Sequence, residues 1–190
     1  MTAAADFTDL RPAGGFSLIM ADPPWSFDNF SGRGEAKNPK AHYDCAQLDW
    51  IKALPVRILA GRDCLLWLWA TNPMLREAFE VLDAWGFEYK TAGHWPKRTK
   101  HGKLAFGTGY ILRCAGEPFL IGTIGAPKTT RSVRSIVEGP VREHSRKPDE
   151  AFEAAERLMP EVQRIELFSR QVRPGWAAWG NETGKFAEAG

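Results

Sequence analysis

The chain contains little cysteine and no long apolar run. Its three cysteines, Cys45, Cys64 and Cys114, are isolated in sequence, so their spacing indicates neither a disulfide framework nor a zinc site. Cys64 and Cys114 lie in apolar stretches, which is typical of buried free thiols in a reducing compartment. No apolar segment is long enough to cross a bilayer, and no secretory signal pattern is visible. We therefore expect a cytoplasmic protein with no membrane partner and no metal.

The charge is nearly balanced overall but unevenly distributed along the chain. The formal net charge is +2. Residues 97–147 contain 11 Lys/Arg and 3 Asp/Glu, a net charge of +8, and the rest of the chain carries −6. A basic middle on an acidic body is the pattern expected for a protein that binds a polyanion. The alternative is a solvated surface loop with an excess of basic residues.

The length and the apolar content predict one folded domain. The chain has 190 residues, of which 44% are hydrophobic, and it has eight tryptophans, a composition that argues against disorder. We predict a short flexible N-terminus over residues 1–15, where alanine and glycine are frequent. A single domain is predicted over residues 16–186.

Strand-like and helix-like segments alternate along this domain. Strands are expected at residues 16–21, 63–70, 87–95 and 164–168, a strand pair at 109–115 and 119–124, and helices at 48–54, 74–85 and 148–159. Basic loops are expected at 97–107 and 126–139. The alternation predicts an α/β fold with a Rossmann-like, doubly wound, mostly parallel sheet and helices on both faces. Ligands of such sheets bind at the carboxyl ends of the strands.

The most specific motif is Asp22-Pro23-Pro24-Trp25, directly after the apolar segment 16–21. One interpretation is structural, because proline cannot continue a central strand. The other is catalytic. The exocyclic amine of adenine is a poor nucleophile, since its lone pair is delocalised into the ring. The Asp22 carboxylate and a backbone carbonyl of the Pro-Pro step can accept hydrogen bonds from the two N–H groups of this amine. Trp25 offers an aromatic face on which the base can stack, worth about 1–3 kcal/mol.

The motif resembles that of amino-directed nucleic-acid methyltransferases, and four later segments narrow the resemblance to the adenine-N6 methyltransferases of the MT-A70 type. These segments are Leu66-Trp67-Leu68-Trp69-Ala70-Thr71-Asn72; Gly107-Thr108-Gly109 with Arg113 and Glu117; His144 to Glu150; and Glu166-Leu167-Phe168-Ser169-Arg170 followed by Trp176 and Gly180-Asn181-Glu182. The resemblance covers nearly the whole chain and points to the bacterial or phage DNA-methylating branch. It implies a permuted chain order, in which the catalytic motif precedes the cofactor strand.

The resemblance also implies a cofactor and its contacts. The donor would be S-adenosylmethionine and the product S-adenosylhomocysteine, with no metal. The residues expected to contact the donor are Ala21 and Asp22 through the main chain, Lys147 at the donor carboxylate, Arg170 and Asn181 at the sugar or carboxylate, and Glu182 at the ribose hydroxyls. The glycine-rich signature of many amino-methyltransferases is absent, and residues 169–175 take its place.

Several of these residues have simpler interpretations. Lys147 could be an exposed lysine beside a helix start, and Asn181-Glu182 could form a polar turn after Gly180. His144 could be a structural histidine. Trp67 and Trp69 are expected in the core, because they lie within an apolar strand.

The predicted substrate is adenine in DNA, with RNA as the alternative. The residues expected to contact nucleic acid are Tyr43, Lys97, Arg98, Lys100 and Lys103, together with Lys128, Arg131 and Arg134 on the other side of the pocket. Adenine in a duplex must be flipped out to reach a deep pocket. No target-recognition domain is visible in the sequence, so we expect a short or relaxed recognition site.

There are two other hypotheses for the function. The protein could be a catalytically silent nucleic-acid-binding partner, or an enzyme that methylates cytosine or a protein amide. The sequence leaves open whether the protein is a monomer or a homodimer.

Overall fold

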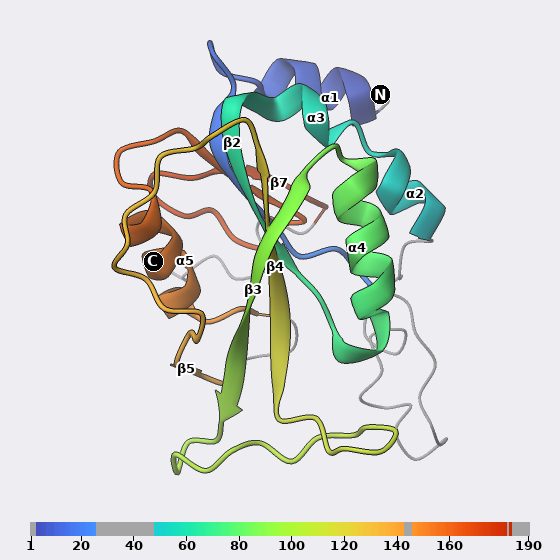
Figure 1. The fold of residues 1–190 in the computed structure, drawn as a ribbon, viewed down its shortest axis with the longest axis vertical. Helices are drawn as coiled ribbons and strands as arrows, with labels where there is room; N and C mark the ends of the chain where they lie inside the picture. The colour runs from blue at the N-terminus through green and yellow to red at the C-terminus, as the bar shows by residue number, and fades with distance from the viewer. Residues whose placement is uncertain (1–2, 26–47, 143–145, 182, 184–190) are drawn as a thin grey trace.

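The computed structural model describes residues 3–25, 48–142, 146–181 and 183, which form a mixed sheet flanked by helices (Figure 1). Within these residues, seven strands are hydrogen-bonded in the order β5-β3-β4-β2-β1-β6-β7. They span Phe16–Ala21 (β1), Ala60–Trp69 (β2), Glu88–Arg98 (β3), Gly116–Ile124 (β4), Gly139–Pro140 (β5), Arg164–Leu167 (β6) and Ala177–Trp179 (β7). Strand β4 is antiparallel to both of its neighbours, and the other adjacent pairs are parallel. The predicted Rossmann-like, mostly parallel sheet is confirmed.

Helices cover both faces of the sheet. Those described are α1 (Ala3–Leu10), α2 (Leu48–Ala53), α3 (Val56–Leu59), the 3₁₀ turn η3 (Asn72–Met74), α4 (Leu75–Ala84) and α5 (Asp149–Leu158). Figure 1 shows α4 and α5 on opposite sides of the sheet, and each packs on its own apolar cluster. None of the described helices is long and apolar enough to span a bilayer.

Strand β1 is apolar except for Ser17, and both of its faces are buried. Ile19 belongs to the cluster on the α4 side and Met20 to the cluster on the α5 side. Parallel pairing places Ala21 beside Leu68 of β2 and beside Leu167 of β6. The carboxyl ends of these three strands therefore lie together. The strand that precedes Asp22 and the strand that resembles the cofactor strand are therefore neighbours in the sheet.

The N-terminal segment forms a helix where the sequence predicted flexibility. Helix α1 buries Phe7 completely, and the Phe7 ring packs edge-on against Trp179 with 4.8 Å between the ring centroids. Arg11 also donates a hydrogen bond to the backbone carbonyl of Ile58 at 2.7 Å. The partners of α1 lie far away in the sequence, so local composition gave no sign of them.

The predicted strand pair at residues 109–115 and 119–124 is wrong in its first member. Strand β4 pairs with β3 instead, with Gly93 opposite Phe119. Residues 99–115 form a long connection between β3 and β4 that projects beyond the sheet (Figure 1). Gly109 lies in a tight turn there, where an added Cβ would come within 2.0 Å of the Leu112 carbonyl oxygen. The turn breaks what looked in sequence like an apolar strand.

Candidate active site

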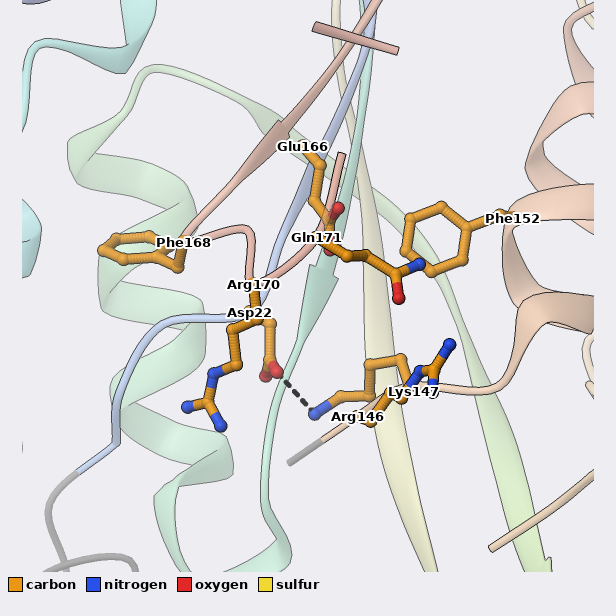
Figure 2. A pocket seen from close by; sticks show the side chains of 8 residues that line it. All are labelled: Asp22, Arg146, Lys147, Phe152, Glu166, Phe168, Arg170 and Gln171. Atoms are coloured by element: carbon orange, nitrogen blue, oxygen red, sulfur yellow. Dashed lines mark hydrogen bonds and ion pairs between the residues drawn. The ribbon is translucent and has the colours of Figure 1, made fainter. Parts of the chain in front are cut away.

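An open pocket lies where the chain leaves β1 and β6. Figure 2 shows the side chains that line it, which come from three parts of the sequence. They are Asp22, Arg146, Lys147, Phe152, Glu166, Phe168, Arg170 and Gln171. The lining therefore combines carboxylates, basic groups and two aromatic rings. Its position at the carboxyl ends of parallel strands agrees with the expected site.

Asp22 reaches the pocket because β1 ends at the residue before it. Its backbone N–H points to the Leu167 carbonyl oxygen at 3.4 Å, which continues the pairing with β6. Pro23 cannot continue this pairing, since it has no N–H to donate. The Asp22 side chain keeps 19% of its surface exposed. Burial raises the pKa of Asp22 above its ordinary value, with a further increase from Glu117, against the lowering effects of Lys147 and Arg170.

Lys147 forms an ion pair with the proposed catalytic carboxylate. Its ammonium donates to Asp22 Oδ2 at 2.7 Å and lies 3.2 Å from Glu117 Oε2. It is also 5.4 Å from the centroid of the Trp69 ring. The Lys147 side chain is only 9% exposed. Burial would lower the pKa of Lys147, but the two facing carboxylates outweigh it and raise this pKa above its usual range.

A second lysine extends this arrangement into a cluster of four charges. Lys97, at the end of β3, donates to Glu117 Oε1, so Glu117 lies between two ammonium groups. Burial opposes ionisation of Glu117, yet Lys147 and Lys97 lower its pKa to about 2. We call Asp22, Lys147, Glu117 and Lys97 the charge cluster. Two carboxylates and two ammonium groups balance one another, which keeps the buried charges paired.

The charge cluster gives Asp22 a fixed direction. A carboxylate accepts about four hydrogen bonds, and Lys147 is directed at only one oxygen, Oδ2. The remaining acceptor capacity can receive an N–H bond from a bound amine. The arrangement therefore suits an aspartate that orients a neutral donor group in the pocket.

Glu166 lies on β6 at the inner side of the pocket. Its Oε2 accepts a hydrogen bond from Ser169 Oγ at 2.8 Å. Burial raises the pKa of Glu166 to about 7, although Ser169 and Arg173 act in the opposite direction. Phe168, two residues after Glu166, has a left-handed backbone with φ of 62°. This conformation is uncommon for an aromatic residue and is often found at functional sites.

This raised pKa predicts how stability changes with pH. The neutral form of Glu166 is favoured by folding, so its stabilising effect is complete below the ordinary pKa of 4.5 and is lost as the pH rises through about 7. We expect Glu166→Gln to gain stability relative to the wild type across this window, on the order of 3 kcal/mol. Urea unfolding at several pH values would measure it, with the exposed Glu153→Gln as control. If the free energies of unfolding of the wild type and the variant differed by the same amount at pH 5 and at pH 7.5, the raised pKa of Glu166 would be contradicted.

Two arginines hold the start of α5 against the segment that follows β6. Arg173 donates to Asp149 Oδ1 at 2.6 Å, and Arg142 donates to the other oxygen of Asp149. The Arg173 guanidinium also lies 3.9 Å from the centroid of the Phe152 ring. Burial would raise the pKa of Asp149, but the two arginines lower it overall. These contacts fix the pocket wall that carries Phe152.

Trp25 does not provide an open stacking surface in this structure, which corrects the sequence-based expectation. Its side chain is 3% exposed and belongs to the core cluster on the α4 side. The indole N–H donates to the Trp69 backbone carbonyl at 3.1 Å. Trp25 therefore ties the segment after β1 to the end of β2. Trp67 and Trp69 are in the core, as expected, each 1% exposed.

The predicted donor contacts are partly brought together. Asp22, Lys147 and Arg170 all line the pocket, and Ala21 precedes it in β1. Asn181 lies in an exposed turn after β7. Glu182, Tyr43 and His144 fall outside the described residues. Lys147 is engaged with the charge cluster, a role that its position before a helix start did not indicate.

The basic residues occupy two different places. Lys97 is part of the charge cluster, while Arg98, at the end of β3, bonds to the Gly102 carbonyl at 3.1 Å. Lys100 and Lys103 are exposed on the connection between β3 and β4. The connection that carries these two lysines leaves the sheet at the carboxyl end of β3 (Figure 1), and β3 runs in the same direction as β1, so the connection starts at the edge of the sheet where Asp22 lies.

The second basic loop does not flank the pocket as predicted. Thr130 donates its backbone N–H to the Leu158 carbonyl at 2.8 Å, so this part of the loop lies at the last turn of α5. The pocket lies at the first turn of this ten-residue helix, about 15 Å away along its axis. Lys128 and Arg131 are therefore at the opposite edge of the sheet, and the prediction that they flank the pocket is wrong. Arg134 is exposed beside the middle of β3.

Six residues of the site were not among the predicted site residues: Glu117 of the charge cluster, and Arg146, Phe152, Glu166, Phe168 and Gln171 of the pocket lining. The sequence places Glu117 between two predicted strands, but in the structure it lies in β4 opposite Trp95, close to the end of β3. An acidic residue inside a mostly apolar strand was the available signal, since such residues are rarely buried without a partner. Glu166 carried the same signal within its strand.

A mostly parallel α/β sheet with a charged pocket at the carboxyl ends of its central strands defines a Rossmann-like enzyme. Residues 16–182 match the MT-A70 family, and the chain belongs to this methyltransferase family. The resemblance found in the sequence is confirmed. MT-A70 methyltransferases use S-adenosylmethionine.

The alignments with individual relatives cover most of this chain but different shares of each relative. The chain is 29% identical over 185 residues to the "Type II methyltransferase M.MunI" of Mycoplasma sp, covering 88% of this chain and 77% of that protein. It is 31% identical over 174 residues to the "N(6)-adenosine-methyltransferase MT-A70-like" protein of Arabidopsis thaliana, covering 89% of this chain and 24% of the relative. It is 29% identical over 187 residues to human "N(6)-adenine-specific methyltransferase METTL4", covering 90% and 38%. The chain thus spans well under half of the plant and human proteins.

Proposed function

We propose that the protein transfers a methyl group from S-adenosylmethionine to the N6 amine of adenine in DNA, giving N6-methyladenine. The observation that carries the proposal is the placement of Asp22. It opens the Asp-Pro-Pro-Trp motif, follows β1 directly and lines the pocket between the ends of β1 and β6.

Asp22 has the properties needed to activate an amine. A hydrogen bond donated by the adenine amine to the Asp22 carboxylate weakens the conjugation of the nitrogen lone pair with the ring. The Pro23 carbonyl already accepts from the Trp25 backbone N–H at 2.8 Å, so Pro24 is the better candidate for the second acceptor. The transfer leaves a surplus proton on the amine. The raised pKa of Asp22 favours transfer of this proton to the Asp22 carboxylate.

The rest of the pocket suits the methyl donor. The donor carries a carboxylate, an ammonium and a sulfonium, and the lining offers charges of both signs. Arg146 and Arg170 are candidates for the carboxylate, Glu166 is a candidate for an ammonium or a hydroxyl, and Phe168 offers an apolar ring. When bound, S-adenosylmethionine supplies an electrophilic methyl group. The protein's contribution is to hold the two reactants close and in line.

The choice of DNA is supported by how much of each relative the chain covers. It spans 77% of the Mycoplasma protein, which is named a Type II methyltransferase. It spans only 24% of the Arabidopsis relative, whose name refers to adenosine. The basic edge near the pocket fits either nucleic acid, because phosphate contacts carry no information about the base sequence.

A matched pair of substrates tests this choice. Purified protein would be incubated with S-adenosylmethionine and either DNA or RNA of the same sequence, and the digested nucleosides analysed by mass spectrometry. We expect N6-methyladenine chiefly in the DNA. A product chiefly in RNA would assign the protein to the RNA enzymes. Donor binding without transfer to either polymer would instead indicate a silent partner or a protein substrate.

A further inference from the structure

The connection between β3 and β4 carries an exposed apolar tip. Ile111 and Leu112 are 94% and 83% exposed, the highest values among the large apolar side chains described. Phe106 on the same connection is 77% exposed. The connection projects beyond the strands (Figure 1). It starts at the carboxyl end of β3, which runs in the same direction as β1, so it leaves the sheet at the edge where Asp22 follows β1. Such a concentration of exposed apolar side chains marks a contact surface.

The tip has a defined backbone. Gly107 donates its N–H to the Cys114 carbonyl at 2.9 Å, and Cys114 donates to the Thr108 carbonyl at 3.1 Å. The turn between these bonds is narrow, and Gly109 approaches the Leu112 carbonyl more closely than a side chain would allow. The two most exposed apolar residues are therefore held at the end of a narrow projection.

The surroundings of the tip are strongly basic. Residues 91–116 contain five Lys/Arg and no Asp/Glu. Lys100 and Lys103 are exposed along the connection, and the Arg113 guanidinium lies 5.0 Å from the centroid of the Phe106 ring. A connection that combines an apolar tip with several cations complements a polyanion with an apolar interior. Duplex DNA has these properties.

The base of the connection is joined to the charge cluster. Lys97 lies just before the connection and Glu117 just after it, and the two side chains pair with each other. Glu117 in turn pairs with Lys147, which pairs with Asp22. The base of the connection is thus anchored to the same side chains that position the proposed catalytic carboxylate.

From these observations we infer that Ile111 and Leu112 enter the duplex and fill the space left when the target adenine is flipped into the pocket. The inference rests on the proposed function. Flipping costs a few kcal/mol of stacking and pairing. Apolar side chains insert between base steps in proteins that kink DNA. In the gap left by a flipped adenine, such side chains would replace part of the lost stacking contact and so lower the cost of flipping. Single-stranded DNA needs no such replacement.

The double variant Ile111→Ala/Leu112→Ala tests the inference on the full chain. DNA from a methylation-free host would be offered either native or heat-denatured, so that both forms have the same sequences. We expect the ratio of duplex to single-strand methylation to fall at least about tenfold, because loss of the wedge leaves flipping uncompensated. Transfer to denatured DNA should stay within about twofold of the wild type. Ile58→Ala, on α3 and 40% exposed, is the matched control and should change neither rate.

Three results would overturn the inference while leaving the proposed function intact. They are an unchanged ratio, an equal loss on both DNA forms, and a change in oligomeric state by light scattering that accounts for the lost activity. The last would make the tip a contact between protein chains. If the wild type methylates adenine in neither form of DNA, the proposed function fails, and the inference fails with it.

Discussion

Replacing Asp22 with asparagine is expected to lower the rate of methyl transfer by about 10²–10⁴-fold. The amide has nearly the shape of the carboxylate but carries no charge, and its NH₂ group offers donors where the amine of adenine needs acceptors. It also cannot take up the proton that the methylated amine releases. Steady-state transfer to DNA, with product identified as N6-methyladenine, would measure the loss.

The asparagine variant should nevertheless fold and bind the donor. Lys147 would keep one facing carboxylate, Glu117, at 3.2 Å, so the buried ammonium stays paired. Calorimetric titration of S-adenosylmethionine should show an affinity close to that of the wild type. Asp83→Asn, exposed on α4, serves as the matched control and should retain full activity. Wild-type rates in Asp22→Asn would exclude the carboxylate from the chemistry.

The largest effect on stability is expected from Lys147→Met. This change keeps much of the side-chain volume but leaves Asp22 and Glu117 without their shared cation. Removing one partner from a buried ion pair costs about 3–5 kcal/mol, because the remaining charge is desolvated and unpaired. The free energy of unfolding in urea at pH 7 would measure the loss.

Two comparisons separate this effect from a general packing defect. Lys97→Met removes the other ammonium of the charge cluster, but the Lys97 side chain is 28% exposed, so its loss should cost about 1 kcal/mol. The double variant Asp22→Asn/Lys147→Met should be more stable than the sum of the single effects predicts, because it removes both charges of one pair. If Lys147→Met were no less stable than Lys97→Met, the charge cluster would not hold the site together.

The fold was largely predictable because its central strands have strong local patterns. The segment around Ile19 is apolar on both faces, which only a buried parallel strand explains well. Asp22 at its end was placed correctly for the same reason, since a strand that stops at a proline delivers its next side chain to the edge of the sheet. The family resemblance supported the order of the strands.

The charge cluster was not predictable in this way. Lys147 and Asp22 are separated by 125 positions in the sequence. The pairing of β1, β2 and β4 brings Glu117 toward Asp22, and the pairing of β4 with β3 brings it beside Lys97. Burial of Trp25 has the same origin, because its indole bonds to the end of β2. The roles of these residues depend on tertiary contacts, which a local sequence motif does not reveal.

The erroneous strand at residues 109–115 shows a related limit. Its apolar residues suggested burial, whereas Ile111 and Leu112 are almost fully exposed. Gly107 and Gly109 favour a tight turn over a strand. The apolar residues that remained without a place in the core are those now assigned to the contact with DNA.

One measurement tests the central claim most directly. The wild type and Asp22→Asn would each be expressed in a host that lacks adenine methylation, and total DNA and RNA digested to nucleosides for mass spectrometry. The pocket built around Asp22 predicts N6-methyladenine in DNA from cells with the wild type and none above background with the variant. A methylated cytosine as the only product, or equal N6-methyladenine with both proteins, would contradict it.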